Sequence, residues 1–242
     1  MTEGTHHHGH KANFSIFTKG VDEFAPAMEI DFLKPILEAI QIGITKSAER
    51  IALIEAGGGD ASDYDDELEM IENLLGVAFV ACQVYITSIV SMVSKARTKK
   101  STDPRCRSLT TKKEILQYGN PSVNTTGKTY VTQIQLMDAM ANYYKHRDQW
   151  ELAFKEEFVG KEKYNVSYWK VEKKKNNRST IKVLKAIGAV PNSSGNFRLA
   201  AEILGNEDYD VRSFVEILEA WGQRIKENCQ KMNQLGTAVN KT

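Results

Sequence analysis

The sequence predicts an all-α protein, a helical bundle built around one central apolar helix. Apolar residues recur three and four positions apart over long segments, which is the period of a helix, and the alternation typical of strands is scarce. The 242 residues contain only five prolines, so few helices are interrupted. The segment 74–94 carries no charged residue, and a helix that is apolar on all sides belongs in the middle of a bundle.

The first two predicted helices cover residues 26–56 and 62–97. Glycines at 57–59 end the first helix, because glycine breaks a helical run. Acidic residues crowd the first turns of the second helix and basic residues its last turn, which matches the helix dipole at both ends. The apolar face of the first helix is formed by Ile30, Leu33, Leu37, Ile40, Ile44 and Ile51.

The uncharged segment 74–94 is also long enough to span a bilayer. Its apolar character is diluted by Gln83, Tyr85 and several hydroxyl side chains, which need protein partners rather than lipid. We therefore expect a central helix that is buried on all sides, in a soluble cytoplasmic protein that does not bind a membrane.

The remaining helices are predicted at 112–118, 130–158, 179–189, 196–204 and 210–232, with Gly188 and Gly205 as helix ends. The basic stretches 98–113 and 170–178 are expected to be exposed loops, and the alternative for the first is a basic edge for phosphate contacts. The expected organisation is a flexible histidine-containing tail at 1–20 and a single all-α domain at 21–242. In that domain a core bundle of about 26–158 is followed by a C-terminal helical part at about 179–236, and the helices 26–56 and 130–158 flank the central one.

The composition argues against several classes of protein. The net charge is +1, so attraction to nucleic acid must come from local patches. Three cysteines, widely spaced, form neither a disulfide framework nor a zinc ribbon. The histidines at 6–10 belong to an added tag or a natural tail, with at most weak affinity for metals. We expect no cofactor and no resident metal.

One motif resembles a phosphate-binding loop without matching it. The stretch SVNTTGKT at 122–129 has Ser122 where the first glycine of that motif would stand. A buried strand should precede such a loop, and the residues before it do not read as one. The pattern therefore predicts an ordinary loop that leads into a helix.

The strongest candidate site is DAMANYYKHRDQWE, residues 138–151, which contains the only histidine outside the first ten residues. On a helix Asn142 and His146 share one face, and Lys145 lies beside Asn142. His146 is the candidate acid or base near neutral pH, with Lys145 as a further catalytic candidate. Arg147 and Lys145 could hold a phosphate, and Asn142 could orient the imidazole or contact the scissile group.

Those side chains are the parts that metal-independent cleavage of RNA requires: a base for the ribose 2′-hydroxyl and cations for the charged transition state. The alternative is structural. His146 would then bridge surface groups at a helix edge, Asp148 would pair with Lys145, and Trp150 would belong to the core.

Asn142-x-x-x-His146, in a mid-chain helix of an all-α chain, resembles the motif of the HEPN superfamily. The resemblance implies a helical bundle and a metal-independent ribonuclease, with roles in toxin–antitoxin or phage-defence systems. The family's arginine would fall on Ala139, Met140 or Ala141, and none of these is cationic. The resemblance therefore also fits a descendant that no longer cleaves. The segment ANYYKHRDQW is in addition similar to a segment of bacterial helical proteins.

The alternative function is a non-catalytic module that binds protein or RNA. Tyr143 and Tyr144 would then stack on bases or fill a pocket of a partner. The candidate partners under the two hypotheses are RNA, a second copy of the chain in a homodimer, and a protein partner such as an antitoxin.

Overall fold

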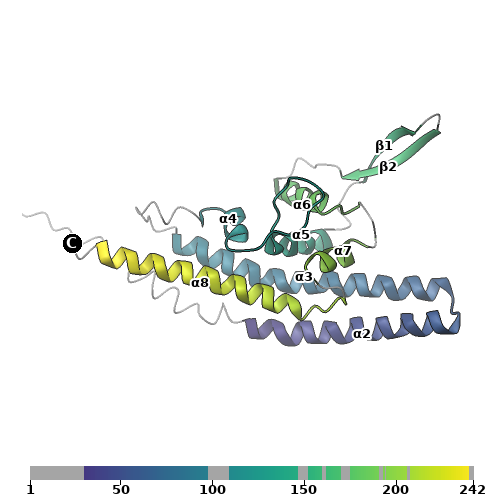
Figure 1. Cartoon of the computed structure of the whole chain (residues 1–242), viewed down its shortest axis with the longest axis horizontal. Helices are drawn as coiled ribbons and strands as arrows, with labels where there is room; N and C mark the ends of the chain where they lie inside the picture. The colour runs from purple at the N-terminus through teal and green to yellow at the C-terminus, as the bar shows by residue number, and fades with distance from the viewer. Residues whose placement is uncertain are drawn as a thin grey trace, which may run out of the picture.

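The computed structural model is an all-α bundle, as the sequence predicts (Figure 1). It describes residues 30–97, 109–146, 152–159, 162–169, 175–190, 193, 195–205 and 208–239, so the predicted tail at 1–20 lies outside the described residues. The elements are η2 (Ile30–Phe32), α2 (Leu33–Gly57), α3 (Ala61–Arg97), α4 (Lys112–Gln117), α5 (Gln133–Lys145), β1 (Leu152–Val159), β2 (Glu162–Trp169), α6 (Lys175–Ala186), α7 (Asn196–Ile203) and α8 (Ser213–Val239).

Helix α3 is the centre of the bundle. Helices α2 and α5 make the most extensive contacts with it, and α7, α8 and α4 also pack on it. In Figure 1 the long helices α2, α3 and α8 run along the length of the molecule, and the shorter α4, α5, α6 and α7 lie on the other side of α3 from α2. This confirms the predicted central helix, the two flanking helices and the C-terminal helices packed on them.

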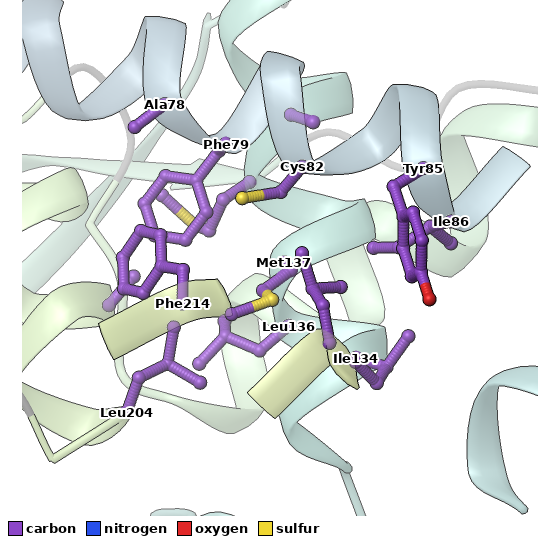
Figure 2. Packing of buried hydrophobic residues seen from close by; sticks show 14 of the residues in the cluster. Ala78, Phe79, Cys82, Tyr85, Ile86, Ile134, Leu136, Met137, Leu204 and Phe214 are labelled. Carbon is purple, nitrogen blue, oxygen red and sulfur yellow. The ribbon is translucent and has the colours of Figure 1, made fainter. Parts of the chain in front are cut away.

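The core face of α3 follows the helical repeat. Phe79, Cys82, Ile86 and Ile89 are fully buried at intervals of three and four residues. Figure 2 shows this face of α3 opposite side chains of α5, such as Met137. The ring of Phe79 stacks on that of Phe214 at the start of α8, with 5.1 Å between the centroids. The apolar stripe therefore joins elements far apart in the sequence.

The prediction that the segment 74–94 is buried on all sides was wrong on one face. Val77 and Val84 keep 41% and 57% of their surface exposed, and Met70, seven residues before Val77 on the same face, keeps 51%. In the described part of the chain one helix, Ala61–Ser94, is long and apolar enough to cross a membrane. Half of the apolar segment that meets this criterion is buried inside the protein. Core helices of soluble proteins commonly pass the same test.

The predicted helix at 130–158 is too long, because α5 ends at Lys145 and His146 is its C-terminal cap. Residues 152–159 form strand β1, which pairs antiparallel with β2 from Leu152↔Trp169 to Val159↔Glu162. The hairpin extends away from the bundle (Figure 1). The missed signals are the aromatic and β-branched residues of both strands, since such residues favour strands.

The other boundaries agree better with prediction. Gly58, Gly188 and Gly205 have φ of 66°, 79° and 86°, and such left-handed conformations end helices. Helix α6 begins at Lys175, so part of the predicted loop at 170–178 is helical. Of the predicted loop at 98–113, residues 98–108 lie outside the described residues and Lys112 opens α4.

Glu72 fixes α7 against α3. Its carboxylate accepts hydrogen bonds from the backbone N–H groups of Phe197 (3.1 Å) and Arg198 (3.2 Å) at the first turn of α7, and from Nε of Arg198 (2.9 Å). Burial raises the pKa of Glu72, and the Arg198 guanidinium together with the two N–H groups opposes that rise. A buried charge with these partners specifies where α7 can dock.

Helices α3 and α5 approach closely at Gly76. A Cβ atom there would overlap the ring of Tyr144, so only glycine allows this packing. The Tyr144 ring also makes an edge contact with Phe197, with 5.6 Å between the centroids. The position of the last turn of α5 therefore depends on a residue without a side chain in α3.

We predict that Gly76→Ala destabilises the protein by about 1–3 kcal/mol, the usual cost of overpacking a filled site. The midpoint of urea unfolding, followed by circular dichroism, measures this effect. Gly57→Ala is the matched control, because no atom lies within 4 Å of a Cβ built at that helical glycine. Equal midpoints for the two variants would contradict the packing argument.

Candidate functional site

Asn142 and His146, at the C-terminal end of α5, line a pocket of about 910 Å³. This volume is at the upper end of the range for small-molecule sites. Four segments line this open pocket, and we call it the basic pocket. Its lining residues are Lys112, Lys113, Leu116 and Gln117 of α4, residues 128–131 of the loop between α4 and α5, Gln135, Asp138, Ala139, Asn142 and His146 of α5, and Ser179, Thr180, Lys182 and Val183 of α6.

Local sequence fixes the start of α5 and joins it to α4. Thr132 and Gln135 form a capping box, in which the Thr132 side chain accepts a hydrogen bond from the Gln135 N–H and the Gln135 side chain accepts one from the Thr132 N–H. The Thr132 hydroxyl also donates to the carbonyl of Leu116 at 2.9 Å. The first turn of α5 is thus held against α4, and the two helices form adjacent walls of the pocket.

A hydrogen-bond network connects the floor of the pocket to the central helix. Gln83, in the uncharged run of α3, donates from Nε2 to the Asp138 carboxylate (2.8 Å), to the Asp138 carbonyl (3.2 Å) and to Oδ1 of Asn142 (3.1 Å). The other Asp138 oxygen forms an ion pair with Nζ of Lys112 at 2.8 Å. Asp138 is 8% exposed, so its charge needs these partners.

The network sets the orientation of the Asn142 amide. The Asp138 carboxylate, paired with Lys112, accepts hydrogen bonds, so Gln83 must present its NH₂ group to it. The same NH₂ group then requires the oxygen of Asn142. This leaves Nδ2 of Asn142 as the group available to a ligand in the pocket, and no described residue accepts a hydrogen bond from it. Asn142 therefore offers a donor, which suits a phosphate oxygen.

The lining carries a surplus of positive charge. Lys112, Lys113, Lys128 and Lys182 face one acidic side chain, Asp138, among the residues that line the pocket. Asp138 neutralises Lys112, and the other three lysines have no acidic partner in the described part of the chain. The pocket therefore favours an anion, although the whole chain is almost neutral.

The loop at 120–131 brings Lys128 to this site. Its ends pair through the N–H of Val123 and the carbonyl of Val131, at 2.8 Å. Its tip is fixed to the end of α6, because Thr126 donates to the carbonyl of Ala186 from both its backbone N–H (2.8 Å) and its hydroxyl (3.1 Å). The loop is an ordinary loop, as predicted, and its anchors place Lys128 between α4 and α6.

The structure brings together some of the candidate residues and separates others. Asn142 and His146 line the pocket, but Lys145 is exposed and is not among the lining residues. Tyr143 is buried and packs on Phe197, with 5.5 Å between the ring centroids, and Tyr144 packs on α3 at Gly76. Neither tyrosine lines the pocket, and both rings pack within the bundle, Tyr143 fully and Tyr144 in part. Arg147 lies outside the described residues.

Several lining residues could not be assigned from the sequence. Asp138 stands in the candidate stretch, yet nothing in the sequence pairs it with Lys112 or with Gln83 of α3. Lys112 belongs to the predicted basic edge, and Lys128 to the loop that resembles a P-loop. The basic character of both segments indicates phosphate contact, but the sequence does not show that the two lysines line the same pocket.

The described residues contain no group of three or more histidine, cysteine or acidic side chains that could hold a metal ion. No family model, curated protein or solved structure matches the chain.

We predict that Gln83→Leu costs about 1–3 kcal/mol of stability, because it removes the donor to the Asp138 carboxylate and leaves a buried acceptor poorly bonded. Chemical denaturation measures the loss. Thr87→Leu, at an exposed position of the same helix, is the control and should change stability by less than about 0.5 kcal/mol. If Gln83→Leu were as stable as this control, the network would have no part in holding α5.

Proposed function

We propose that the protein binds RNA in the basic pocket and cleaves it without a metal, with His146 as the acid/base group. The observation that carries the proposal is the pocket itself. It combines a histidine, an amide donor from Asn142 and three lysines without acidic partners among the described residues. A chain of phosphates with a reactive hydroxyl beside each one is the ligand that uses all three kinds of group.

The proposed reaction assigns a role to each group. His146 takes the proton of a ribose 2′-hydroxyl, and the 2′-oxygen attacks the adjacent phosphorus. The bond from phosphorus to the 5′-oxygen of the next nucleotide breaks, and that oxygen receives a proton from the imidazolium or from a lysine ammonium. The products are a 2′,3′-cyclic phosphate and a 5′-hydroxyl. The lysines and Nδ2 of Asn142 stabilise the extra negative charge on the phosphoryl oxygens.

The resemblance to the HEPN superfamily supports the same proposal. The motif's arginine is missing at 139–141, but the lysines of α4, α6 and the loop supply positive charge from other elements. Under this proposal the protein acts on RNA in the cytoplasm, in a toxin–antitoxin or phage-defence setting, and an antitoxin is a candidate partner.

One observation favours a second candidate, an RNA-binding module that does not cleave. Transfer of the 2′-hydroxyl proton and protonation of the leaving oxygen are two separate tasks. Asp138 is engaged by Lys112 and Gln83, so His146 is the one candidate base among the described residues that line the pocket. The lysines would bind RNA equally well if this single group did not cleave it, and the protein would then be a binding module.

We predict that His146→Ala lowers the rate of RNA cleavage at least about a hundredfold, the usual contribution of a general base, while RNA affinity stays within a few-fold. The assay uses purified protein, mixed RNA and a chelator, with products resolved on a denaturing gel. Stability should change by no more than about 1 kcal/mol, because His146 is a partly exposed helix cap.

The two candidates separate in this assay. Cleavage by the wild type that resists the chelator and disappears in His146→Ala supports the ribonuclease. Tight binding with no cleavage by the wild type supports the binding module. Cleavage that continues in His146→Ala contradicts the role of His146, and the absence of both binding and cleavage contradicts the proposed function.

We predict that Lys182→Ala weakens RNA binding and lowers the slope of log affinity against log salt by roughly 0.7, the value expected when one lysine no longer neutralises a phosphate of a single strand. Lys185→Ala is the matched control. Both lysines are exposed on α6, but only Lys182 lines the pocket, so Lys185→Ala should bind as the wild type does. Equal losses in the two variants would mean that RNA is attracted by α6 in general and not by the pocket.

A further inference from the structure

Tyr130 is an aromatic side chain that the proposed reaction does not use. It lines the basic pocket and keeps 55% of its surface exposed. Of the large apolar side chains that are exposed in the described ranges, Tyr130 is the one that belongs to the pocket lining. An exposed tyrosine is common on protein surfaces, but proteins that bind single strands combine such a ring with a basic groove, and bases stack on it.

The ring of Tyr130 is held in place. Its hydroxyl donates to the carbonyl of Asn120 at 3.2 Å, across the base of the same loop. The next residue, Val131, accepts the hydrogen bond from the N–H of Val123 that closes the loop. A ring fixed at both its backbone and its hydroxyl loses little conformational freedom when a flat ligand covers it.

A cation accompanies the ring on the same short segment. Lys128 is two residues before Tyr130, so their Cα atoms are at most about 7 Å apart. Lys128 has no acidic partner among the described residues. A fixed aromatic face beside an available ammonium matches the two parts of one nucleotide, the base and its phosphate.

We propose that Tyr130 is the stacking surface for one base of the bound RNA, and that the pocket therefore takes single-stranded RNA in preference to duplex. This inference rests on the proposed function, because it assumes that the lysines hold the RNA phosphates. Inside a duplex both faces of each base are covered by its neighbours, so a base on Tyr130 must be unpaired. Stacking accepts any base, and the pocket should show little sequence preference at this position.

The test compares three labelled ligands by fluorescence anisotropy at one salt concentration. The first is an oligouridine of about ten nucleotides, within the range of single-strand site sizes. The second is an abasic strand with the same number of phosphates, and the third is the oligouridine annealed to oligoadenosine. The wild type should bind the oligouridine about tenfold or more tighter than the abasic strand, the effect expected for one stacked base, and tighter than the duplex.

Two variants locate the effect at the ring. Tyr130→Leu should bind oligouridine as weakly as the abasic strand, with unchanged affinity for the abasic strand itself. Tyr130→Phe keeps the ring and loses the bond to Asn120, so it should retain the preference for oligouridine. Thermal melting checks that both variants remain folded.

The outcomes distinguish this inference from the proposed function. Equal affinity of the wild type for oligouridine and the abasic strand, or tighter binding of the duplex, would overturn stacking and leave the phosphate contacts intact. A Tyr130→Leu variant that loses affinity for the abasic strand as well would show that the ring supports the loop and not a base. No measurable binding of any ligand would overturn both proposals.

Discussion

The uncharged run of α3 is the constraint on which the rest of the structure depends. A helix with this composition is unstable in water unless its apolar side chains are covered, and each fully buried one contributes on the order of 1.5–3 kcal/mol. Phe79, Cys82 and Ile86 meet this requirement through α5 and α8, as Figure 2 shows. Helices α2, α4 and α7 also pack on α3. The arrangement of the bundle therefore follows largely from the need to cover the apolar surface of this one helix.

That same run contains one amide, Gln83, and its burial has a consequence for the site. A buried amide must be bonded, and its partners are Asp138 and Asn142 on α5. Apolar packing alone would tolerate small shifts of α5 along α3, whereas these hydrogen bonds allow one register. The register places Asn142 and His146 at the pocket, and the ion pair between Asp138 and Lys112 brings α4 to the same place. The same hydrogen-bond network therefore forms the polar part of the core and the floor of the pocket.

The positive charge of the pocket arises only when the chain folds and brings distant elements together. Lys112, Lys128 and Lys182 come from three elements, and each alone would be an ordinary exposed lysine. Thr126 and Thr132 hold the loop and the helices that carry them, through bonds to α6 and α4. A nearly neutral chain thus acquires a local surplus of positive charge, which for a phosphate ligand matters more than the net charge.

The sequence by itself determined the helical class, the central helix and most helix ends, because periodicity and glycine placement are local properties. It also identified Asn142 and His146 as residues of one face, since their spacing alone puts them there. Only the tertiary structure decided that Lys145 lies outside the pocket, that Tyr143 is buried in the core, and that Tyr130 is exposed at the edge. The spacing of residues shows which side chains share a face of a helix, but it does not show which of them a neighbouring helix covers. The hairpin at 152–169 was missed because the charged residues 155–157 interrupt the alternation in β1, although β2 alternates, and the pairing of the two strands is visible only in the fold. The lysines of the pocket depend on contacts between elements distant in the chain, and no local pattern records such contacts.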